Sequence, residues 1–337
     1  MSESDPTQAE QDSTETASST RPNRRRVLQG IGAAGAAVAV GASGSAAEGP
    51  ESRTGGNIAN DAHPELDDEE IPTSAHLGSF TNSDMSVAEL IEACADAGFH
   101  AVEPHQIDDE DAVATAIDET HVEMGTVHVD GLLSDIEDDP AAVADTYSQF
   151  GDPTLIHPGA EDVDWTSRSA VESFADRINA AAADLDAEGL TLGYHNLDNE
   201  FQTVGDGTVA YDVLVSNLAA GIHLQLDVGW VRAAGEDPIQ YVIDYENDIW
   251  SVQLKNVMDG EPAEIDEGIV GMRGVATAAR RAAAVDYLVY EYDDAPNPTE
   301  SMETGADWLN ELNGPWEPGG ICAVPGFNIH PAKVHRP

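Results

Sequence analysis

The amino-acid sequence predicts a single α/β domain folded as a closed (β/α)8 TIM barrel over residues 72–313. Within these residues a short apolar run, a polar turn and an amphipathic stretch follow one another eight times, which is the strand and helix alternation of such a barrel. The length is also about that of one barrel, roughly 250 residues. Eight units without a long interruption favour closure over an open doubly wound sheet. No GxGxxG follows the first apolar run, which argues against dinucleotide binding.

The expected strands are apolar runs rich in Val, Ile, Leu or Tyr. In chain order they are residues 75–79, 101–104, 124–128, 154–157, 191–195, 223–228, 249–254 and 287–292. Amphipathic helices fill the intervals, among them residues 87–97, 170–185, 210–219 and 275–284. Gly98, Gly189 and Gly221 stand shortly before strands, where glycine most readily adopts the left-handed conformation that ends a helix.

The two ends of the chain fall outside the expected barrel. Residues 1–47 have the order of a twin-arginine signal peptide, with an acidic n-region, the arginines Arg24 to Arg26 and an uncharged run of small residues at 30–47. That run is short and poor in Leu, Ile and Phe for a membrane span. Residues 48–71 predict a disordered acidic linker, and residues 314–337 form a tail with five prolines and four glycines. We therefore expect a protein exported in its folded state to an extracytoplasmic location, with no membrane association after signal removal.

The chain carries 64 acidic and 14 basic residues, a formal net charge of −50. Such a surface repels polyanions, so nucleic acids and anionic membranes are not expected partners. Because high salt screens the self-repulsion, the excess of carboxylates indicates halophilic adaptation. The hydrophobic content of 41% indicates a folded core rather than disorder. Cys94 and Cys322 are the only cysteines, and the sequence does not decide whether they form a disulfide.

Acids, histidines and amides stand at the carboxyl ends of most expected strands. They are Glu103, His128, His157, His195 with Asn196, Asp227 with Trp230, Gln253 with Lys255, and Glu291. In a TIM barrel these ends meet at one mouth, where the site lies. One histidine at a strand end is more often a hydrogen-bonded filler, but the convergence of several polar groups indicates a functional site.

These strand ends resemble the sugar phosphate isomerase/epimerases with a xylose isomerase-like barrel, in the branch whose fifth strand reads YHNHDFEF. Residues 194–201 read YHNLDNEF, residues 226–230 read LDVGW, and residues 253–256 read QLKN where the family has HLKD. Glu267-Gly268 and then Glu291-Tyr292-Asp293 follow. The order and spacing of these strings make the resemblance specific from about residue 72 to residue 312.

The resemblance implies a divalent metal ion, Mn²⁺, Zn²⁺, Co²⁺ or Mg²⁺, held by His195, Asp227, Gln253 and Glu291. Such an ion polarises a carbonyl group while a base removes the proton on the neighbouring carbon, and the enediolate is then reprotonated. Gln253 stands where the family has histidine, and His195 stands where many relatives have a carboxylate. A histidine in place of a carboxylate lowers the negative charge of the ligand set, and a neutral amide oxygen binds these metals less strongly than imidazole, so both departures weaken cation binding.

We expect catalytic roles for four residues: His195, Glu291, Lys255 and Glu103. Lys255, one of two lysines in the chain, would stabilise an oxyanion or bind substrate, and a salt bridge at the rim is its structural alternative. Substrate contacts are expected from His128, His157, Asn196, Trp230 and Glu200. The tryptophan would pack or stack against a sugar face, and Glu200 has helix or loop capping as its alternative.

Three functions remain open at this point. The first is an exported, metal-dependent isomerase or epimerase that acts on a small carbohydrate, unphosphorylated because of the export. The second is a lyase that eliminates a leaving group from 3-keto sugars, and the third is a barrel that binds sugar without turnover. A related barrel, the endonuclease that cleaves abasic DNA, needs a basic face, which the net charge contradicts. The oligomeric state stays open.

Overall fold

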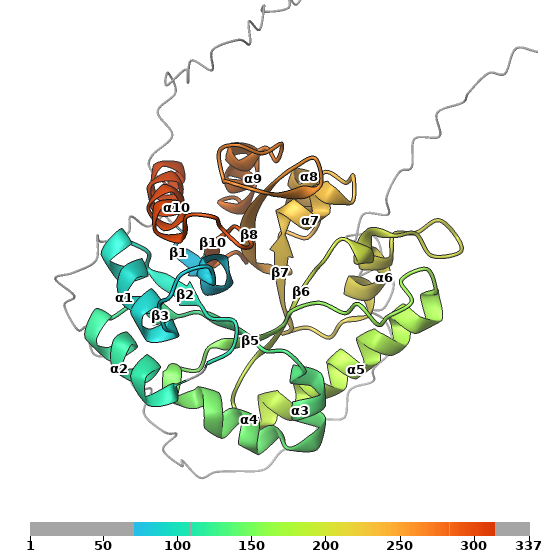
Figure 1. Ribbon diagram of the computed structural model, residues 1–337. Helices are drawn as coiled ribbons and strands as arrows, with labels where there is room; N and C mark the ends of the chain where they lie inside the picture. Colours follow the sequence, from blue (N-terminus) through green and yellow to red (C-terminus); the bar gives the residue numbers. More distant parts are fainter. Residues whose placement is uncertain (1–70, 108, 283, 314–337) are drawn as a thin grey trace, which may run out of the picture. The chain divides into compact units, whose positions relative to one another are not determined.

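The computed structural model describes residues 71–107, 109–282 and 284–313 (Figure 1). The chain divides into two units, Met1–Gly56 and Asn57–Pro337, and every described residue lies in the second. The expected signal at 1–47 and tail at 314–337 therefore lie outside the described residues. The same holds for the expected linker at 48–71 except Ile71, which is buried in the core.

Parallel strands form the centre of the described unit, with helices around them (Figure 1). The strands are β1 Thr73–His76, β2 Ala101–Glu103, β3 Glu123–Met124, β4 Thr126–His128, β5 Thr154–His157, β6 Leu192–His195, β7 His223–Asp227, β8 Ile249–Met258 and β10 Tyr287–Glu291. Their lateral order is β3-β2-β1-β10-β8-β7-β6-β5-β4. The short strand β9, Glu261–Ala263, pairs with β8 in the antiparallel sense.

Backbone hydrogen bonds close this sheet into a barrel. β3 and β4 are consecutive halves of the expected third strand, interrupted at Gly125. A side chain at Gly125 would lie 3.0 Å from the ring of Tyr287, so glycine makes room for that ring. The His128 amide donates to the Pro104 carbonyl at 2.9 Å, and the Gln106 amide donates to the His128 carbonyl at 3.0 Å. The expected (β/α)8 barrel is confirmed, with eight strand positions.

Ten α-helices connect the described strands. They are α1 Val87–Ala97, α2 Glu110–Thr120, α3 Leu132–Asp138, α4 Pro140–Tyr147, α5 Arg168–Ala187, α6 Ala210–Asn217, α7 Val228–Ala233, α8 Pro238–Asp244, α9 Met272–Ala279 and α10 Pro298–Asn313. α1 shows how local sequence sets the ends: Ser86 and Glu89 form a capping box at its start, and Gly98, at φ 97°, ends it. No helix within the described ranges is long and apolar enough to cross a bilayer.

The first strand differs from the expectation. Residues 75–79 are expected to be extended, whereas the strand ends at His76 and residues 77–80 form a 3-10 helix. Two contacts hold this turn over the barrel end: the Ser79 hydroxyl accepts from the Tyr292 amide at 3.0 Å, and the Phe80 ring stacks on Tyr290 at 6.1 Å. His76, not Ser79, is therefore the residue at the carboxyl end of β1.

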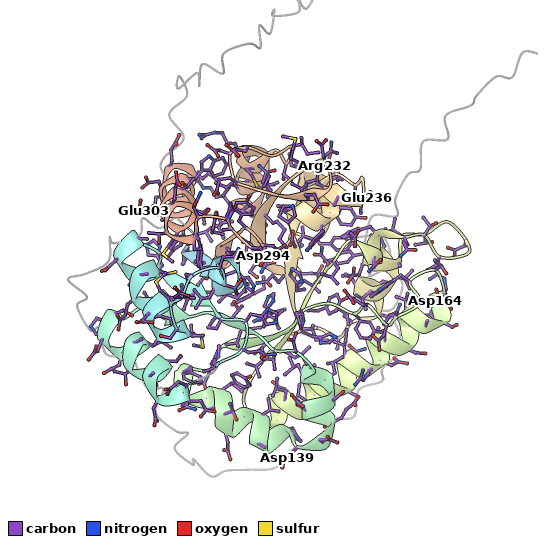
Figure 2. The ribbon with its side chains drawn as sticks, viewed as in Figure 1. Asp139, Asp164, Arg232, Glu236, Asp294 and Glu303 are labelled. Atoms are coloured by element: carbon purple, nitrogen blue, oxygen red, sulfur yellow. The ribbon has the colours of Figure 1, made fainter. Side chains whose placement is uncertain are left out.

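Side chains alternate between two environments along the strands. Outward-facing residues build the apolar core between strands and helices, as Tyr194 does against Phe174 of α5. Inward-facing residues near the carboxyl ends are polar and nevertheless buried: His76, Glu103, His128, His195, Gln225, Asp227, Gln253, Lys255 and Glu291. Exposed carboxylates such as Asp139, Asp164 and Glu303 lie on the outside (Figure 2). The fold thus collects its buried polar groups at one place.

Candidate functional site

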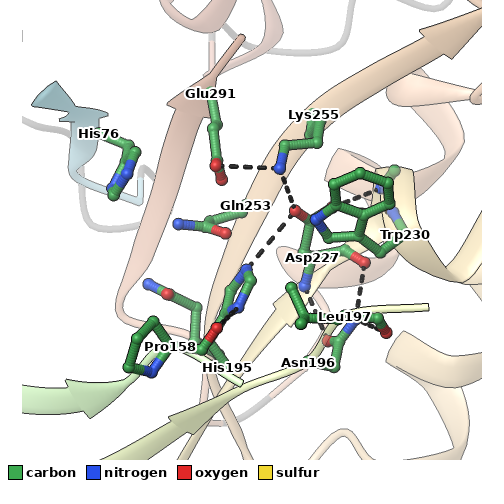
Figure 3. Close-up of polar contacts among 12 residues, drawn as sticks. His76, Pro158, His195, Asn196, Leu197, Asp227, Trp230, Gln253, Lys255 and Glu291 are labelled. Atoms are coloured by element: carbon green, nitrogen blue, oxygen red, sulfur yellow. Dashed lines mark hydrogen bonds and ion pairs between the residues drawn. The ribbon is translucent and has the colours of Figure 1, made fainter. Parts of the chain in front are cut away.

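Four buried polar atoms meet at the carboxyl ends of β6, β7 and β10 and beside the middle of the longer strand β8 (Figure 3). They are His195 Nε2, Asp227 Oδ2, Gln253 Oε1 and Glu291 Oε2, and none has a hydrogen-bond partner among the described residues. Ligand atoms of the histidine and the two carboxylates all lie within 4.8 Å of one another. Because buried polar atoms are almost always satisfied in folded proteins, a converging set without partners indicates a place for a cation.

Strand register explains why residues far apart in the sequence meet here. Asp227 of β7 is the register partner of Gln253 of β8, and Lys255 of β8 is the register partner of Glu291 of β10. Neighbouring parallel strands therefore carry these side chains at the same level of the barrel. The four ligands expected from the resemblance are brought together.

His195 is oriented with one ring nitrogen toward the cluster. Its Nδ1 lies 3.2 Å from the Pro158 carbonyl, and since a carbonyl only accepts, Nδ1 carries the proton. Nε2 then holds a lone pair, 3.5 Å from Asp227 Oδ2. A histidine fixed in this way through its other nitrogen is the usual form of a metal-ligating imidazole.

Asp227 has one oxygen committed to the backbone and one directed into the cluster. Oδ1 accepts from the Gly229 and Trp230 amides, at 2.7 and 3.1 Å, and so caps α7. Asn196 holds the backbone of Asp227 from the other side, accepting from its amide at 3.0 Å and donating to its carbonyl at 3.2 Å. Burial would raise the pKa of Asp227, but Lys255, His195 and the Trp230 amide together outweigh it and lower this pKa.

Lys255 places its ammonium group among three carboxylates. Nζ lies 3.0 Å from Asp227 Oδ2, 3.0 Å from Glu291 Oε1 and 2.8 Å from Asp293 Oδ2, although its approach to Asp227 is not a hydrogen bond of normal geometry. A side chain at Gly229 would lie 2.8 Å from Lys255 Cγ, so this glycine makes room for the lysine stem. Burial would lower the pKa of Lys255, but the three carboxylates raise it above its ordinary value. The amine therefore stays protonated.

One ammonium beside three carboxylates leaves an excess of negative charge in a buried place. Burial, together with the charges of Asp293 and Asp227, raises the pKa of Glu291 well above its ordinary value, against the effect of Lys255. A divalent cation would remove this excess. Trp230 covers the lysine from outside, with Nζ 4.5 Å from its ring centroid, so that face of the indole is already occupied.

Glu103 lies in a second cluster, beside the first. Oε1 accepts from His76 Nδ1 at 2.9 Å and from Gln253 Nε2 at 2.6 Å, while Oε2 accepts from Thr126 and Gln225. Burial would raise the pKa of Glu103, but the imidazoles of His128 and His76 and the hydrogen bonds outweigh it and lower this pKa. The carboxylate is thus ionised and fully hydrogen-bonded. It also fixes the Gln253 amide, whose oxygen turns toward the first cluster.

His76, Glu103 and His128 also have ligand atoms within 4.8 Å of one another. This second set fits a metal ion less well than the first, because both oxygens of its carboxylate already accept hydrogen bonds. In addition, His128 Nε2 lies 2.6 Å from Gln225 Oε1, and burial lowers the pKa of His128 well below its ordinary value.

His157 and Glu200, two of the expected substrate-binding residues, are not brought to either cluster. The His157 ring packs on Phe174 and Tyr194, with both ring centroids 6.0 Å away, because its place in β5 turns it toward α5. Glu200 accepts from the Tyr194 hydroxyl at 2.5 Å and from the Leu197 amide at 3.1 Å. Both Glu200 oxygens are therefore used to hold the loop after β6.

The position of His157 predicts a pH dependence of stability. Burial, aided by the charge of Arg177, lowers its pKa from 6.5 to about 4. The unfolded chain binds this proton near pH 6.5 and the folded protein only near pH 4, so stability is complete above pH 6.5 and falls as the pH drops toward 4. The wild-type protein is expected to lose up to about 3 kcal/mol of unfolding free energy through His157 over this pH range. The His157→Phe protein should not show this part of the loss. Equal losses of unfolding free energy in both proteins between pH 7 and pH 4 would contradict this.

Comparisons with known proteins agree with this architecture. A family model described as xylose isomerase-like TIM barrel matches residues 91–312. A sugar phosphate isomerase/epimerase from Parabacteroides distasonis is 16% identical over 73% of this chain and 95% of its own, with a TM-score of 0.61. No curated protein sequence matches the chain.

Two further solved structures share the fold. The probable 3-DHS dehydratase AsbF from Bacillus anthracis is 13% identical over 71% of this chain and 99% of its own, with a TM-score of 0.55. The IolI protein with a bound zinc atom is 11% identical over 72% of this chain and 98% of its own, with a TM-score of 0.58. At such identities the likeness concerns the fold.

Proposed function

The chain belongs to the xylose isomerase-like TIM-barrel family, and from this membership and the geometry of the site we propose that it is a sugar isomerase or epimerase. The reaction is the transfer of a proton on a carbon next to a carbonyl group. The convergence of four buried polar atoms that lack hydrogen-bond partners, beside a buried lysine, carries the proposal. Its substrate is a small carbohydrate.

The donor set suits a divalent ion. An imidazole nitrogen, two carboxylates and an amide oxygen are ligands that Mn²⁺, Zn²⁺, Co²⁺ or Mg²⁺ accept, and the buried excess of negative charge calls for a cation. His195, Asp227, Gln253 and Glu291 would hold it. The zinc in the IolI structure supports this assignment. When bound, the ion polarises the substrate carbonyl and offsets the charge that develops on its oxygen.

The chain's own residues orient the substrate and stabilise charge. The Lys255 ammonium is held in place by Asp227, Glu291 and Asp293. Its positive charge stabilises a substrate oxygen that becomes negative when the neighbouring carbon loses its proton. Because this ammonium is fixed before the substrate arrives, little reorganisation accompanies the reaction. The enediolate is then reprotonated on the same carbon, which epimerises the sugar, or on the adjacent carbon, which isomerises it.

Solvent exchange tests this proposal. The full chain, folded at high salt and loaded with Mn²⁺ or Zn²⁺, is incubated in D₂O with D-fructose, D-xylose and methyl 3-keto-α-D-glucopyranoside, and the sugars are analysed by mass spectrometry. We expect one deuterium to enter at least one sugar and the exchange to stop when EDTA removes the ion. No exchange with any sugar would contradict an isomerase, and if no ion is bound either, it would favour a sugar-binding barrel.

The second candidate function is a lyase that catalyses β-elimination, and the dehydratase among the proteins of similar fold supports it. Loss of a leaving group beside a ketone begins with the same proton removal. The methyl 3-keto-glycoside separates the two outcomes, because a lyase releases methanol from it whereas an isomerase returns the glycoside intact. If methanol is released at the rate of deuterium uptake, the protein is a lyase and not an isomerase.

Gln253 offers a gain-of-affinity prediction. The amide already donates to Glu103 at 2.6 Å, and a histidine at this position can make the same hydrogen bond with one nitrogen while the other binds metal. Gln253→His is expected to raise the Zn²⁺ affinity about tenfold or more, measured by competition with a chelator. The exposed Gln240→His is the control and should leave the affinity unchanged. An unchanged affinity in Gln253→His would mean that the other three ligands do not share a site.

We also infer that the protein works outside the cytoplasm at high salt, after export in the folded state. The signal pattern at residues 1–47 and the net charge of −50 support this inference, and the same charge disfavours phosphorylated sugars, nucleic acids and anionic membranes as partners. Replacing the arginines Arg24 to Arg26 by lysine should abolish export in a host cell. Export that survives this change would contradict the twin-arginine route.

A further inference from the structure

His76, at the end of β1, has no role in the ion site or the oxyanion site described above. Its Nδ1 lies 2.9 Å from Glu103 Oε1, and the two residues are register partners in neighbouring strands. Glu103 is completely buried, and its two oxygens also accept from Thr126, Gln225 and Gln253, so it accepts the Nδ1 proton as well. Nε2 is left with a lone pair. A buried carboxylate thus fixes the ring and the tautomer of this histidine.

A glycine packs closely against the Nε2 side of the His76 ring. Gly78 follows in the 3-10 helix Leu77–Phe80, and a side chain at this position would lie 2.5 Å from His76 Nε2 and 2.8 Å from Cδ2. Any other residue would therefore press on the nitrogen that carries the lone pair. The glycine backbone thus packs against this part of the imidazole without displacing the ring.

Other basic groups near this mouth already have partners. Lys255 is bound by three carboxylates, His195 presents its free nitrogen to the ion site, and His128 is held through Nε2, which donates to the Gln225 amide oxygen. The histidine rings form a row across the barrel, with centroids 4.7 Å apart for His76 and His128 and 5.1 Å apart for His128 and His195. Figure 3 shows Glu291 and Gln253 between His76 on one side and Lys255 on the other.

We propose that His76 is the residue that removes and returns the substrate proton, and that Glu103 positions it. This inference rests on the proposed function. In the step, the bond between the proton and the carbon beside the carbonyl breaks, and a bond between that proton and Nε2 forms. The released electron pair makes the carbon–carbon double bond of the enediolate, and the carbonyl oxygen takes the negative charge on the Lys255 side. Return of the proton to the same carbon restores the carbonyl and completes an epimerisation. Return to the adjacent carbon, together with transfer of the hydroxyl proton from one oxygen of the enediolate to the other, completes an isomerisation, and neither needs an oxidant or a reductant.

The first test compares two histidines of the same mouth in the D₂O exchange assay, with a sugar that the wild-type protein labels. His76→Gln is expected to slow exchange about 100-fold or more through kcat, with the Mn²⁺ affinity unchanged. His105→Gln, at a side chain that is 39% exposed and paired with Asp130, should stay within a few-fold of wild type. Added imidazole should restore part of the exchange in His76→Ala, which the loss of a purely structural contact would not allow.

The second test does not depend on turnover. In ¹⁵N spectra of protein labelled on histidine, with the signal assigned by its loss in His76→Gln, we expect a proton on Nδ1 and none on Nε2. Gly78→Ala should lower the exchange rate while leaving Mn²⁺ binding intact. A proton on Nε2, or exchange in His76→Gln within a few-fold of wild type, overturns this proposal alone. No exchange by the wild-type protein overturns the proposed function, and this proposal with it.

Discussion

Lys255→Met is expected to destabilise the metal-free protein by about 3–5 kcal/mol, the cost of removing one partner from a buried group of charges. The methionine fills the space over Gly229 but leaves Asp227 and Glu291 buried without their cation. The free energy of unfolding, measured by denaturant titration at fixed high salt, reports this loss. A saturating divalent ion should recover a large part of it, because the ion neutralises the same carboxylates.

The matched control for this prediction is Arg273→Met. Arg273 also forms an ion pair, with Glu311 at 2.8 Å, and lies 5.5 Å from the Trp308 ring centroid, as Lys255 lies over Trp230. Its side chain is 51% exposed, whereas that of Lys255 is 2% exposed. The control should cost about 1 kcal/mol or less. Equal losses in the two variants would mean that the Lys255 carboxylates are well solvated, and the argument from buried charge would be lost.

Asp227→Asn is expected to lower the divalent-ion affinity by about 100-fold or more and to slow deuterium exchange to a similar degree. The substitution removes a negative ligand while an asparagine oxygen still caps α7, so the fold should be retained. Isothermal titration with Mn²⁺ measures the affinity, and circular dichroism checks the fold.

Asp237→Asn supplies the control for that experiment. Asp237 caps α8 by accepting from the Ile239 amide at 3.1 Å, so the two substitutions share their effect on a helix cap. Only Asp227 directs its other oxygen into the cluster. An Asp227→Asn protein that binds Mn²⁺ as tightly as wild type would remove Asp227 from the ion site.

Much of the fold follows from local sequence signals. The alternation of apolar runs and amphipathic stretches predicts the barrel, and α1 begins and ends at residues whose types favour those positions, Ser86 and Gly98. The ligand set at His195, Asp227, Gln253 and Glu291 could be expected because each residue stands at or near the end of an expected strand, and parallel strands end at one mouth. The resemblance of short strings in the right order made that expectation specific.

Other features depend on contacts that the sequence does not reveal. His76 was missed because residues 75–79 look like one apolar run, whereas contacts with Tyr292 and Tyr290 turn residues 77–80 into a helix. The hydrogen bonds of Glu103 come from Thr126, Gln225 and Gln253, on strands far away in the sequence. A polar residue within a strand carries no local sign of such partners.

Side-chain direction is the third feature that strand ends alone do not fix. His157 ends β5 as His195 ends β6, and both are predicted at the same mouth. Only packing shows that His157 turns outward against Phe174, whereas His195 turns inward to Asp227. A shift of one residue along a strand reverses the direction of its side chains. Sequence patterns therefore predict where the barrel mouth lies better than they predict which side chains point into it.

Anomalous X-ray scattering from a crystal grown at high salt with Mn²⁺ tests the central claim most directly. We expect one strong manganese peak among His195 Nε2, Asp227 Oδ2, Gln253 Oε1 and Glu291 Oε2, at distances of about 2.0 to 2.3 Å from its ligands. A peak between His76, Glu103 and His128 instead, or none in the barrel, would contradict the ion site on which the proposed reaction depends.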